Sequence, residues 1–261
     1  MNVLSLFDGM SCGRIALERA GIQVDNYYAS EVDKWAIQVA KNNYPDTHHI
    51  GDVTQVSADD LPQIDLLIGG SPCQGFSFAG RQLNFDDPRS ALFFEYVRLL
   101  KETKPTYFLL ENVRMKQEYQ DVISEQLGVK PVKINSSLLS AQNRVRLYWT
   151  NIPNVTAPKD KGITLADIID DGFVDREKSY CIDANYFRGG NLKRYFKRSS
   201  RQLVFTNKNF TEYRKLTPIE CERLQTVPEN YTDGVSNTQR YKMLGNGWTT
   251  DIISHILKNV K

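Results

Sequence analysis

The chain has 261 residues, 41% hydrophobic and 25% charged, with a formal net charge of +2, an ordinary composition for a globular protein of one or one and a half domains. No apolar run approaches the roughly 18 residues of a membrane span, and the start, MNVLSLFDGM, lacks the basic segment of a secretion signal. The four cysteines form no CxxC pair, which disfavours a zinc site or a disulfide framework and indicates a reducing cytosol.

Strands and helices alternate through the first half of the chain. Apolar runs predict strands at residues 2–7, 24–30, 64–70, 106–113 and 145–152, with a further strand that ends before Gly51. Helical patterns run from Ile15 to Ala20, over residues 34–44 and over residues 90–103. This alternation is typical of an α/β fold with a parallel sheet and helices on both faces, in which ligands bind at the carboxyl ends of the strands.

Glycines and acids follow the first three strands. The loop FDGMSCG comes after the first, but it is not GxGxxG, so a dinucleotide oxidoreductase is disfavoured. Glu31 follows the second strand, at a spacing suited to ribose hydroxyls. Asp52 follows the third and could hold an exocyclic amine while Val53 packs on a purine ring. The alternatives are a helix-dipole acid for Glu31 and a simple turn at Asp52.

A cysteine and a buried acid follow the next two strands. Cys73 lies after Pro72 in the glycine-containing segment IGGSPCQGFSFAGRQ, and Glu111 ends a buried apolar run, where a carboxylate is costly unless it is used or paired. A thiolate and a carboxylic acid can together add across a conjugated ring. The thiolate attacks one ring carbon while the acid protonates a ring nitrogen, and the neighbouring carbon becomes electron-rich enough to attack a methyl donor.

Residues 184–210 contain no Asp or Glu, although the net charge of the whole chain is close to zero. A local basic and aromatic stretch of this kind predicts binding of a polyanion, and a solvated surface loop is the alternative. The stretch carries seven cations: Arg188, Lys193, Arg194, Lys197, Arg198, Arg201 and Lys208.

Six motifs, in order, resemble those of the DNA (cytosine-5)-methyltransferase family: FDGMSCG, SPCQGFS, ENV, QNRVR, RKLTPIECERLQTVP and LGNGW. The resemblance covers nearly the whole chain. It implies a Rossmann-like sheet that uses S-adenosylmethionine, with S-adenosylhomocysteine as product, and a small target recognition domain. Some details look closest to the de novo mammalian type, such as Glu31-Val32 and Asp52-Val53. The absence of a regulatory domain indicates a compact bacterial or phage member in the cytoplasm.

The resemblance also implies catalytic roles. Cys73 is the nucleophile toward carbon 6 of cytosine, and Glu111 binds and protonates ring nitrogen 3. Arg146 holds the cytosine carbonyl oxygen, and Arg144 orders the site and a neighbouring phosphate. Because a base inside a duplex cannot be attacked from its face, the target must be extruded into a pocket.

Cofactor roles follow in the same way. Phe7 stacks on the adenine, Glu31 binds the ribose and Asp52 the adenine amine. Ser11 departs from the family pattern, because many members carry a second glycine there, and Asn246-Gly247 replaces the more usual Asn-Ser. The other implied cofactor residues are Asp8, Gly9, Met10, Gly13, Val32, Val53, Pro72, Leu92, Asn246 and Trp248.

We expect a catalytic and cofactor domain over residues 1–152 and 240–261, and a target recognition domain over residues 153–239. The expected partner is double-stranded DNA, with no metal and no membrane. We favour a monomer, and the sequence leaves open whether a restriction enzyme accompanies the protein and which bases it recognises. The implied DNA contacts are Gln74, Ser77, Arg81, Arg188, Lys193, Arg194, Lys197, Arg198 and Arg201.

Two alternatives share these motifs. A tRNA cytosine methyltransferase would carry Cys-Phe-Thr in its recognition region, where this chain has SYCIDANYF. A non-catalytic DNA-binding relative would have lost Pro-Cys or Glu-Asn-Val, and both are present.

Overall fold

The computed structural model describes residues 1–72 and 88–261, with the backbone alone at residues 88–90. The chain forms two compact units. The first unit comprises Met1–Ile134, Val145–Ala157 and Ser254–Lys261, and the second comprises Asn135–Arg144 and Pro158–Ile253. These bounds differ from those of the predicted domains, because residues 135–144 and 240–253 belong to the second unit.

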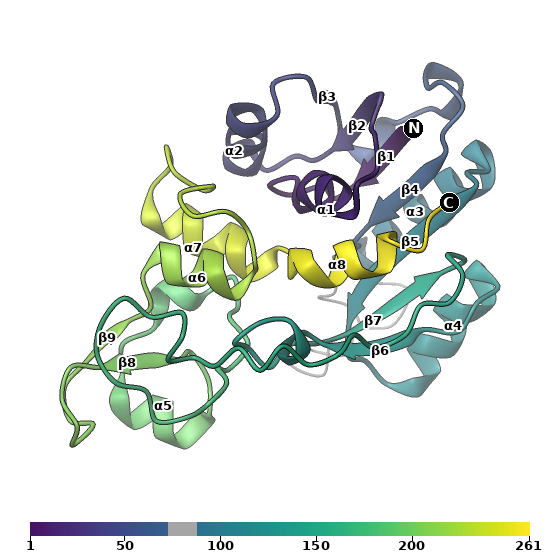
Figure 1. The fold of residues 1–261 in the computed structure, drawn as a ribbon. Coiled ribbons are helices and arrows are strands. Elements are labelled where there is room, and N and C mark those ends of the chain that lie inside the picture. The colour runs from purple at the N-terminus through teal and green to yellow at the C-terminus, as the bar shows by residue number, and fades with distance from the viewer. Residues whose placement is uncertain (73–87) are drawn as a thin grey trace. The chain divides into compact units, whose positions relative to one another are not determined.

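The first unit is built on a seven-stranded sheet with the order β3-β2-β1-β4-β5-β7-β6 (Figure 1). Strands β1 to β5 pair in parallel, whereas β7 is antiparallel to β5. The strands are β1 (Asn2–Leu6), β2 (Asn26–Ser30), β3 (His48–Gly51), β4 (Leu66–Gly69), β5 (Tyr107–Val113), β6 (Val132–Asn135) and β7 (Val145–Thr150).

The antiparallel direction of β7 corrects the expectation of a parallel sheet. A parallel connection needs a dozen or more residues, usually with a helix. Only residues 136–144 join β6 to β7, and they hold a single 3-10 turn at Ser136–Leu138. The antiparallel ladder carries β5 through Glu111 and on to Val113, which is also the end of the predicted strand.

Four helices accompany these strands: α1 (Cys12–Ala20), α2 (Lys34–Asn43), α3 (Pro88–Thr103) and α4 (Gln117–Leu127). The predicted helices are confirmed, with ends moved by three residues or fewer, whereas α4 and β6 were not predicted. Right-handed crossovers in this strand order put α1 and α2 on one face of the sheet and α3 on the other. Figure 1 shows α1 in front of the sheet and α3 behind it.

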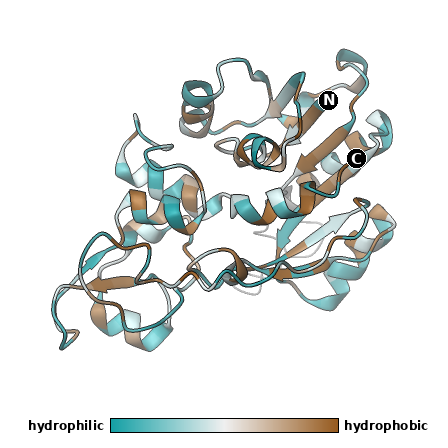
Figure 2. Ribbon diagram, in the orientation of Figure 1, coloured by the Kyte–Doolittle hydropathy of each residue, from teal (hydrophilic) through white to brown (hydrophobic). Residues whose placement is uncertain are grey.

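Apolar side chains from the sheet and its helices form the core of the first unit. Leu4, Leu67, Leu110 and Trp149 are buried in one cluster with residues of α3 and α4. Figure 2 shows the hydrophobic residues gathered on the central strands, while the helices carry both hydrophobic and hydrophilic residues. Each fully buried large aliphatic side chain contributes about 1.5–3 kcal/mol, so the core fixes where the strand ends lie.

The second unit contains a two-stranded antiparallel sheet of β8 (Leu203–Phe205) and β9 (Tyr213–Lys215). Its helices are α5 (Leu192–Arg198), α6 (Pro218–Leu224) and α7 (Asn237–Asn246), and α8 (Thr250–Leu257) passes from this unit into the first at Ser254. A small hydrophobic core of this unit joins Tyr195 of α5 to Leu203 and Phe205 of β8. None of the described helices is both long and apolar enough to span a bilayer.

Candidate active site

One residue from each of the five parallel strands lies in a row across the sheet of the first unit, at the carboxyl ends of β1, β2, β3 and β4 and at Leu110 within β5. Gly51, Ser30, Leu6, Gly69 and Leu110 are register partners of one another in turn. The residue that follows each therefore emerges at the same sheet edge, which is where α/β proteins bind ligands. These residues are Asp52, Glu31, Phe7, Gly70 and Glu111, so the register brings together predicted cofactor residues and the predicted acid.

Glu111 and Arg146 face each other at this edge. In the antiparallel ladder Glu111 is opposite Tyr148 and Val113 is opposite Arg146, so side chains of the acid and the arginine lie diagonally on one face. The Arg146 Nε atom lies 2.8 Å from Glu111 Oε1, and the two side chains are 13% and 11% exposed. The structure thus brings together, in one largely buried ion pair, the groups expected to hold ring nitrogen 3 and the carbonyl oxygen.

Asn112, beside Glu111, ties the end of β4 to β5. Its Nδ2 atom donates to Ser71 Oγ at 3.1 Å, and both residues are buried. Pro72 is half-buried at the end of the described segment. The predicted nucleophile Cys73 and the predicted DNA contacts Gln74, Ser77 and Arg81 lie outside the described residues.

The FDGMSCG loop turns sharply between β1 and α1. Phe7, Gly9 and Ser11 all have left-handed backbone angles, with φ of 58°, 61° and 62°. The Gly9 amide donates to Glu31 Oε2 at 2.8 Å, which fastens the loop to the end of β2. Burial raises the pKa of the Asp8 carboxyl above its ordinary value, against the opposing effect of hydroxyl groups that donate to it.

The other predicted cofactor residues divide into exposed and buried groups. Val32 is 69% exposed, and exposed Asp52 accepts from the Thr54 amide at 2.9 Å, so it caps the 3-10 turn Val53–Gln55. Val53, in contrast, packs in the core of the first unit, so the expected contact of its side chain with a purine has no support in the structure. Met10 and Gly13 are also buried, and Leu92 packs partly buried against the core.

An aromatic ring, a glycine loop and two acids at neighbouring strand ends fit the chemistry of a nucleoside cofactor. Carboxylates accept hydrogen bonds from ribose hydroxyls and from an exocyclic amine, and Phe7 offers a face for stacking. No cluster of three or more His, Cys, Asp or Glu side chains that could hold a metal ion occurs in the described part of the chain.

Arg144 and Gln142 organise the second unit. The Arg144 side chain is buried and donates to the carbonyl oxygens of Ile182, Gly245 and Gly247 at 3.0, 3.2 and 2.8 Å. Gln142 donates to the carbonyl of Leu224 at 2.7 Å. Arg144 therefore holds the LGNGW segment, which carries exposed Asn246 and half-buried Trp248. These contacts agree with the expected ordering role, whereas the expected phosphate contact stays a prediction.

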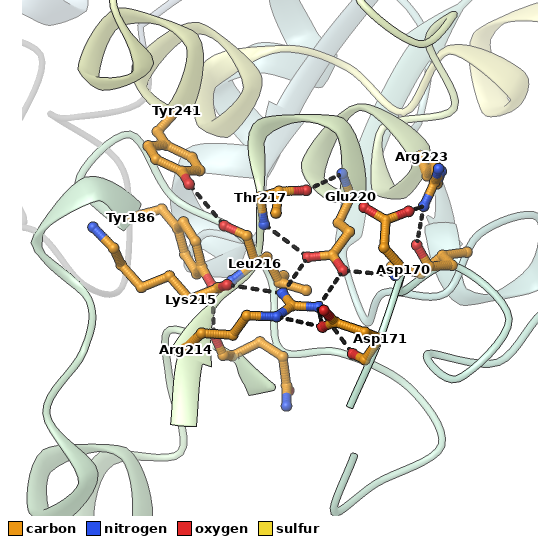
Figure 3. Close-up of polar contacts among 12 residues, drawn as sticks. Asp170, Asp171, Tyr186, Arg214, Lys215, Leu216, Thr217, Glu220, Arg223 and Tyr241 are labelled. Carbon is orange, nitrogen blue, oxygen red and sulfur yellow. Dashed lines mark hydrogen bonds and ion pairs between the residues drawn. The ribbon is translucent and has the colours of Figure 1, made fainter. Parts of the chain in front are cut away.

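The RKLTPIECERLQTVP motif forms a polar network, shown in Figure 3. Glu220 is fully buried, and its two carboxylate oxygens each accept from Arg214 at 2.8 Å. The same carboxylate accepts from the amides of Thr217 and Asp170, while the Thr217 hydroxyl accepts from the Glu220 amide in a capping box at the start of α6. The network joins β9, α6 and the segment at Asp170 and Asp171 into one support.

Helix α5 presents the basic stretch to solvent. Asn191 caps it by accepting from the Arg194 amide at 2.8 Å, and buried Tyr195 anchors it through a 2.7 Å bond to Asp175. The outer positions Lys193, Arg194, Lys197 and Arg198 are exposed, and none forms an ion pair with another residue in the described ranges. Phe196 is 57% exposed among them. Arg188 is also exposed, whereas Arg201 is half-buried.

Two features of these regions could not be identified from the sequence alone. The basic and aromatic composition of residues 184–210 does not single out Phe196, although its place next to buried Tyr195 on a helix puts it on another face. Ser5 and Tyr27, which donate to Asp8, carried no signal, because a hydroxyl on a predicted strand is common in any fold.

The model of a family described as C-5 cytosine-specific DNA methylase matches residues 1–152 and 140–261. The chain is 32% identical to the type II methyltransferase M1.ScrFI of Lactococcus lactis subsp. cremoris, over 99% of this chain and 77% of that protein. It is 30% identical to M.NlaX of Neisseria lactamica, over 99% and 96%. The solved structure of Spodoptera frugiperda DNMT2 has a TM-score of 0.74 at 20% identity, covering 99% of this chain and 98% of that one, a similarity of fold.

Proposed function

The chain belongs to the C-5 cytosine-specific DNA methylase family, and on this premise we propose that it methylates carbon 5 of cytosine in duplex DNA by extruding the base and forming a covalent adduct with Cys73. S-adenosylmethionine supplies the methyl group. The observation that supports the proposal is the sheet register, which puts the Glu111–Arg146 pair on the same sheet edge as the residues proposed to bind the nucleoside, Phe7, Glu31 and Asp52.

Three side chains have separate roles in the reaction at the cytosine ring. The Cys73 thiolate forms a bond to ring carbon 6, and Glu111 gives a proton to ring nitrogen 3, so electron density moves to carbon 5. Arg146 holds the carbonyl oxygen and, through its 2.8 Å contact, orients Glu111. Carbon 5 gains the methyl group, and S-adenosylhomocysteine is the leaving group. Ring nitrogen 3 then returns its proton to Glu111, carbon 5 loses its proton to solvent, and the bond between carbon 6 and sulfur breaks, so the thiolate leaves.

Cys73 suits the nucleophile better than two of the other cysteines. Cys12 and Cys221 are buried, and burial raises the pKa of the Cys221 thiol well above its usual range. A nucleophilic cysteine must instead form a thiolate and reach its substrate.

Residues at the ends of β1, β2 and β3 bind and orient the cofactor in this proposal. Phe7 offers its ring to the adenine, Glu31 its carboxylate to the ribose and Asp52 its carboxylate to the adenine amine. Asn246 and Trp248 lie in the segment that Arg144 holds within the second unit, and their cofactor contacts stay predictions. Arg144 is in this proposal a positioning residue.

The second unit reads and holds DNA. The exposed cations of α5 meet phosphates, as expected for a polyanion surface that is not neutralised by nearby acids. We place the protein in the cytoplasm of a bacterial or phage-infected cell, as a monomer. Because similar proteins are named type II methyltransferases, a cognate restriction enzyme is a candidate partner.

A labelled methyl-transfer assay on duplex DNA and on tRNA tests the proposal. We expect methylation of duplex DNA alone, and its complete loss in Cys73→Ala with binding of S-adenosylhomocysteine unchanged. Glu111→Gln keeps a hydrogen-bond donor but cannot release a proton, so it should lose about 10²–10⁴ in rate. Methylation of tRNA in place of DNA, or full activity of Cys73→Ala, would contradict the proposal.

A further inference from the structure

The carboxyl group of Asp8 receives hydroxyl donors from three segments of the first unit. Its Oδ1 atom accepts from Ser5 Oγ of β1 at 2.6 Å and from Tyr27 OH of β2 at 2.7 Å. Its Oδ2 atom accepts from Ser11 Oγ at the start of α1. Ser5, Ser11 and Tyr27 are all buried, at 1%, 0% and 0% exposure. We call these four residues the Asp8 cluster.

The Asp8 cluster lies around a loop whose backbone conformation is unfavourable without additional contacts. Ser11 has a φ of 62°, a left-handed conformation disfavoured for any residue with a Cβ atom. Such angles persist where the surrounding structure over-determines them. The Ser11 amide donates to the Asp8 carbonyl at 3.1 Å, and the Asp8 amide donates to the Ser30 carbonyl at 3.1 Å, so both main chain and side chains fix this turn.

Ser11 is the N-cap residue of α1, yet its hydroxyl makes no capping bond to the helix. Serine at this position ordinarily accepts from an amide of the first turn. Here the hydroxyl points the other way and donates to Asp8. The hydroxyl of this left-handed residue therefore adds a side-chain bond within the loop, and Asp8 is the residue that accepts it.

We propose that the Asp8 cluster is a positioning device that holds the loop Phe7–Ser11 in the conformation that receives S-adenosylmethionine, with the Ser11 hydroxyl bond offsetting the cost of a left-handed backbone at Ser11. The inference rests on the proposed function. The Asp8 carboxylate already accepts hydrogen bonds from three hydroxyl groups, so we infer that it affects cofactor binding by fixing the loop. The loop residues that it positions at the strand edge are Phe7 and Gly9.

Tyr27→Phe is the sharpest test, because the Tyr27 side chain is fully buried and cannot touch a bound cofactor. Removing one hydroxyl bond to a carboxylate should weaken S-adenosylhomocysteine binding about tenfold, measured by titration calorimetry without DNA. Ser11→Ala loses the hydroxyl and keeps the left-handed strain, so we expect a similar loss. Ser11→Gly removes the strain and should lose only about threefold.

Ser124→Ala is the matched control. Ser124 in α4 accepts from the Trp149 indole at 2.9 Å and donates to the Gln120 carbonyl at 2.6 Å, so the substitution removes two hydroxyl bonds from the same unit at a place away from the loop. It should lower the melting temperature and leave cofactor affinity unchanged. Amide hydrogen exchange at residues 9–11 should rise in Tyr27→Phe and Ser11→Ala, and not in Ser124→Ala.

Wild-type affinity in Tyr27→Phe and Ser11→Ala would overturn the inference, as would equal weakening by Ser124→Ala, which would indicate general destabilisation. A direct contact between Asp8 and the cofactor predicts no effect of Tyr27→Phe. If the wild-type protein binds S-adenosylhomocysteine and does not methylate cytosine, the proposed function fails and the positioning role stands. Failure of the wild-type protein to bind would overturn both.

Discussion

Removal of the four outward cations of α5 tests whether this helix meets DNA. The change is a fourfold alanine variant of Lys193, Arg194, Lys197 and Arg198, all exposed and without ion pairs among the described residues. Alanine has the highest helix propensity, and Tyr195 keeps its anchoring bond to Asp175, so the fold should survive.

The expected magnitude follows from counterion release. Each cation that neutralises a phosphate contributes about −0.9 to the slope of log affinity against log salt, so four contacts contribute about −3.6. Between 50 and 200 mM salt, a fourfold change, the wild-type affinity should therefore fall about 10²-fold more than that of the variant. The loss should be similar for all DNA sequences, because phosphate contacts carry no base information.

Fluorescence anisotropy with a labelled duplex at several salt concentrations measures both slopes. The matched control replaces Lys41, Lys101, Lys130 and Lys133, which are exposed in the first unit, and changes the net charge by the same four units. The control should weaken binding far less. If the α5 variant retains the wild-type slope, or if the control flattens it equally, α5 is a solvated surface and the DNA contacts lie elsewhere.

Three further predictions concern the stability of the described units. In Gly245→Ala the new Cβ would lie 2.1 Å from the carbonyl carbon of Asp183. The free energy of unfolding, measured in urea, should therefore fall by about 3 kcal/mol, the upper end for overpacking, and a decrease under 1 kcal/mol would refute the clash. Arg214→Ala leaves the buried Glu220 carboxylate without its guanidinium and should cost about 3 kcal/mol, measured by thermal unfolding, and an unchanged melting temperature would contradict this. The pKa of Asp8 is raised, so its contribution to folding is fully present below its unfolded pKa of 3.8 and is lost as pH rises through the folded value. The stability of wild type relative to Asp8→Asn, from urea unfolding between pH 4 and 7, should therefore fall as pH rises, and a constant difference would show that the carboxyl is not perturbed.

Local patterns predicted the parallel half of the sheet well. Apolar runs bounded by Gly and Pro located β1, β4 and β5, because a strand buried on both faces must be apolar throughout. Given those strands, the rule that ligands bind at carboxyl ends selected the FDGMSCG loop, Glu31 and Glu111, which the register brings to one edge. The role of Phe7 within that loop came from family resemblance.

Other features of the fold and of the site depend on contacts between distant residues, which a local sequence pattern cannot predict. The direction of β7 is set by the short connection at residues 136–144 and by its pairing with β5. Val53 looks like a binding residue in sequence because it adjoins Asp52, yet its side chain turns into the core. The ordering role of Arg144 came from family resemblance, and the carbonyl oxygens that it meets are about 40 and 100 residues distant along the chain.

The discontinuity of the first unit has a consequence for its synthesis. Strand β5 ends at Val113, its antiparallel neighbour β7 begins at Val145, and residues 254–261 complete the unit. At about 5–20 residues per second, roughly 7–30 s pass between translation of Val113 and translation of Ser254. During that interval the first unit lacks its last eight residues, and until Val145–Thr150 is made β5 also lacks its antiparallel partner, so the nascent chain carries an unpaired strand edge. The β1-α1-β2 segment, whose contacts are local, can form at the start of this wait.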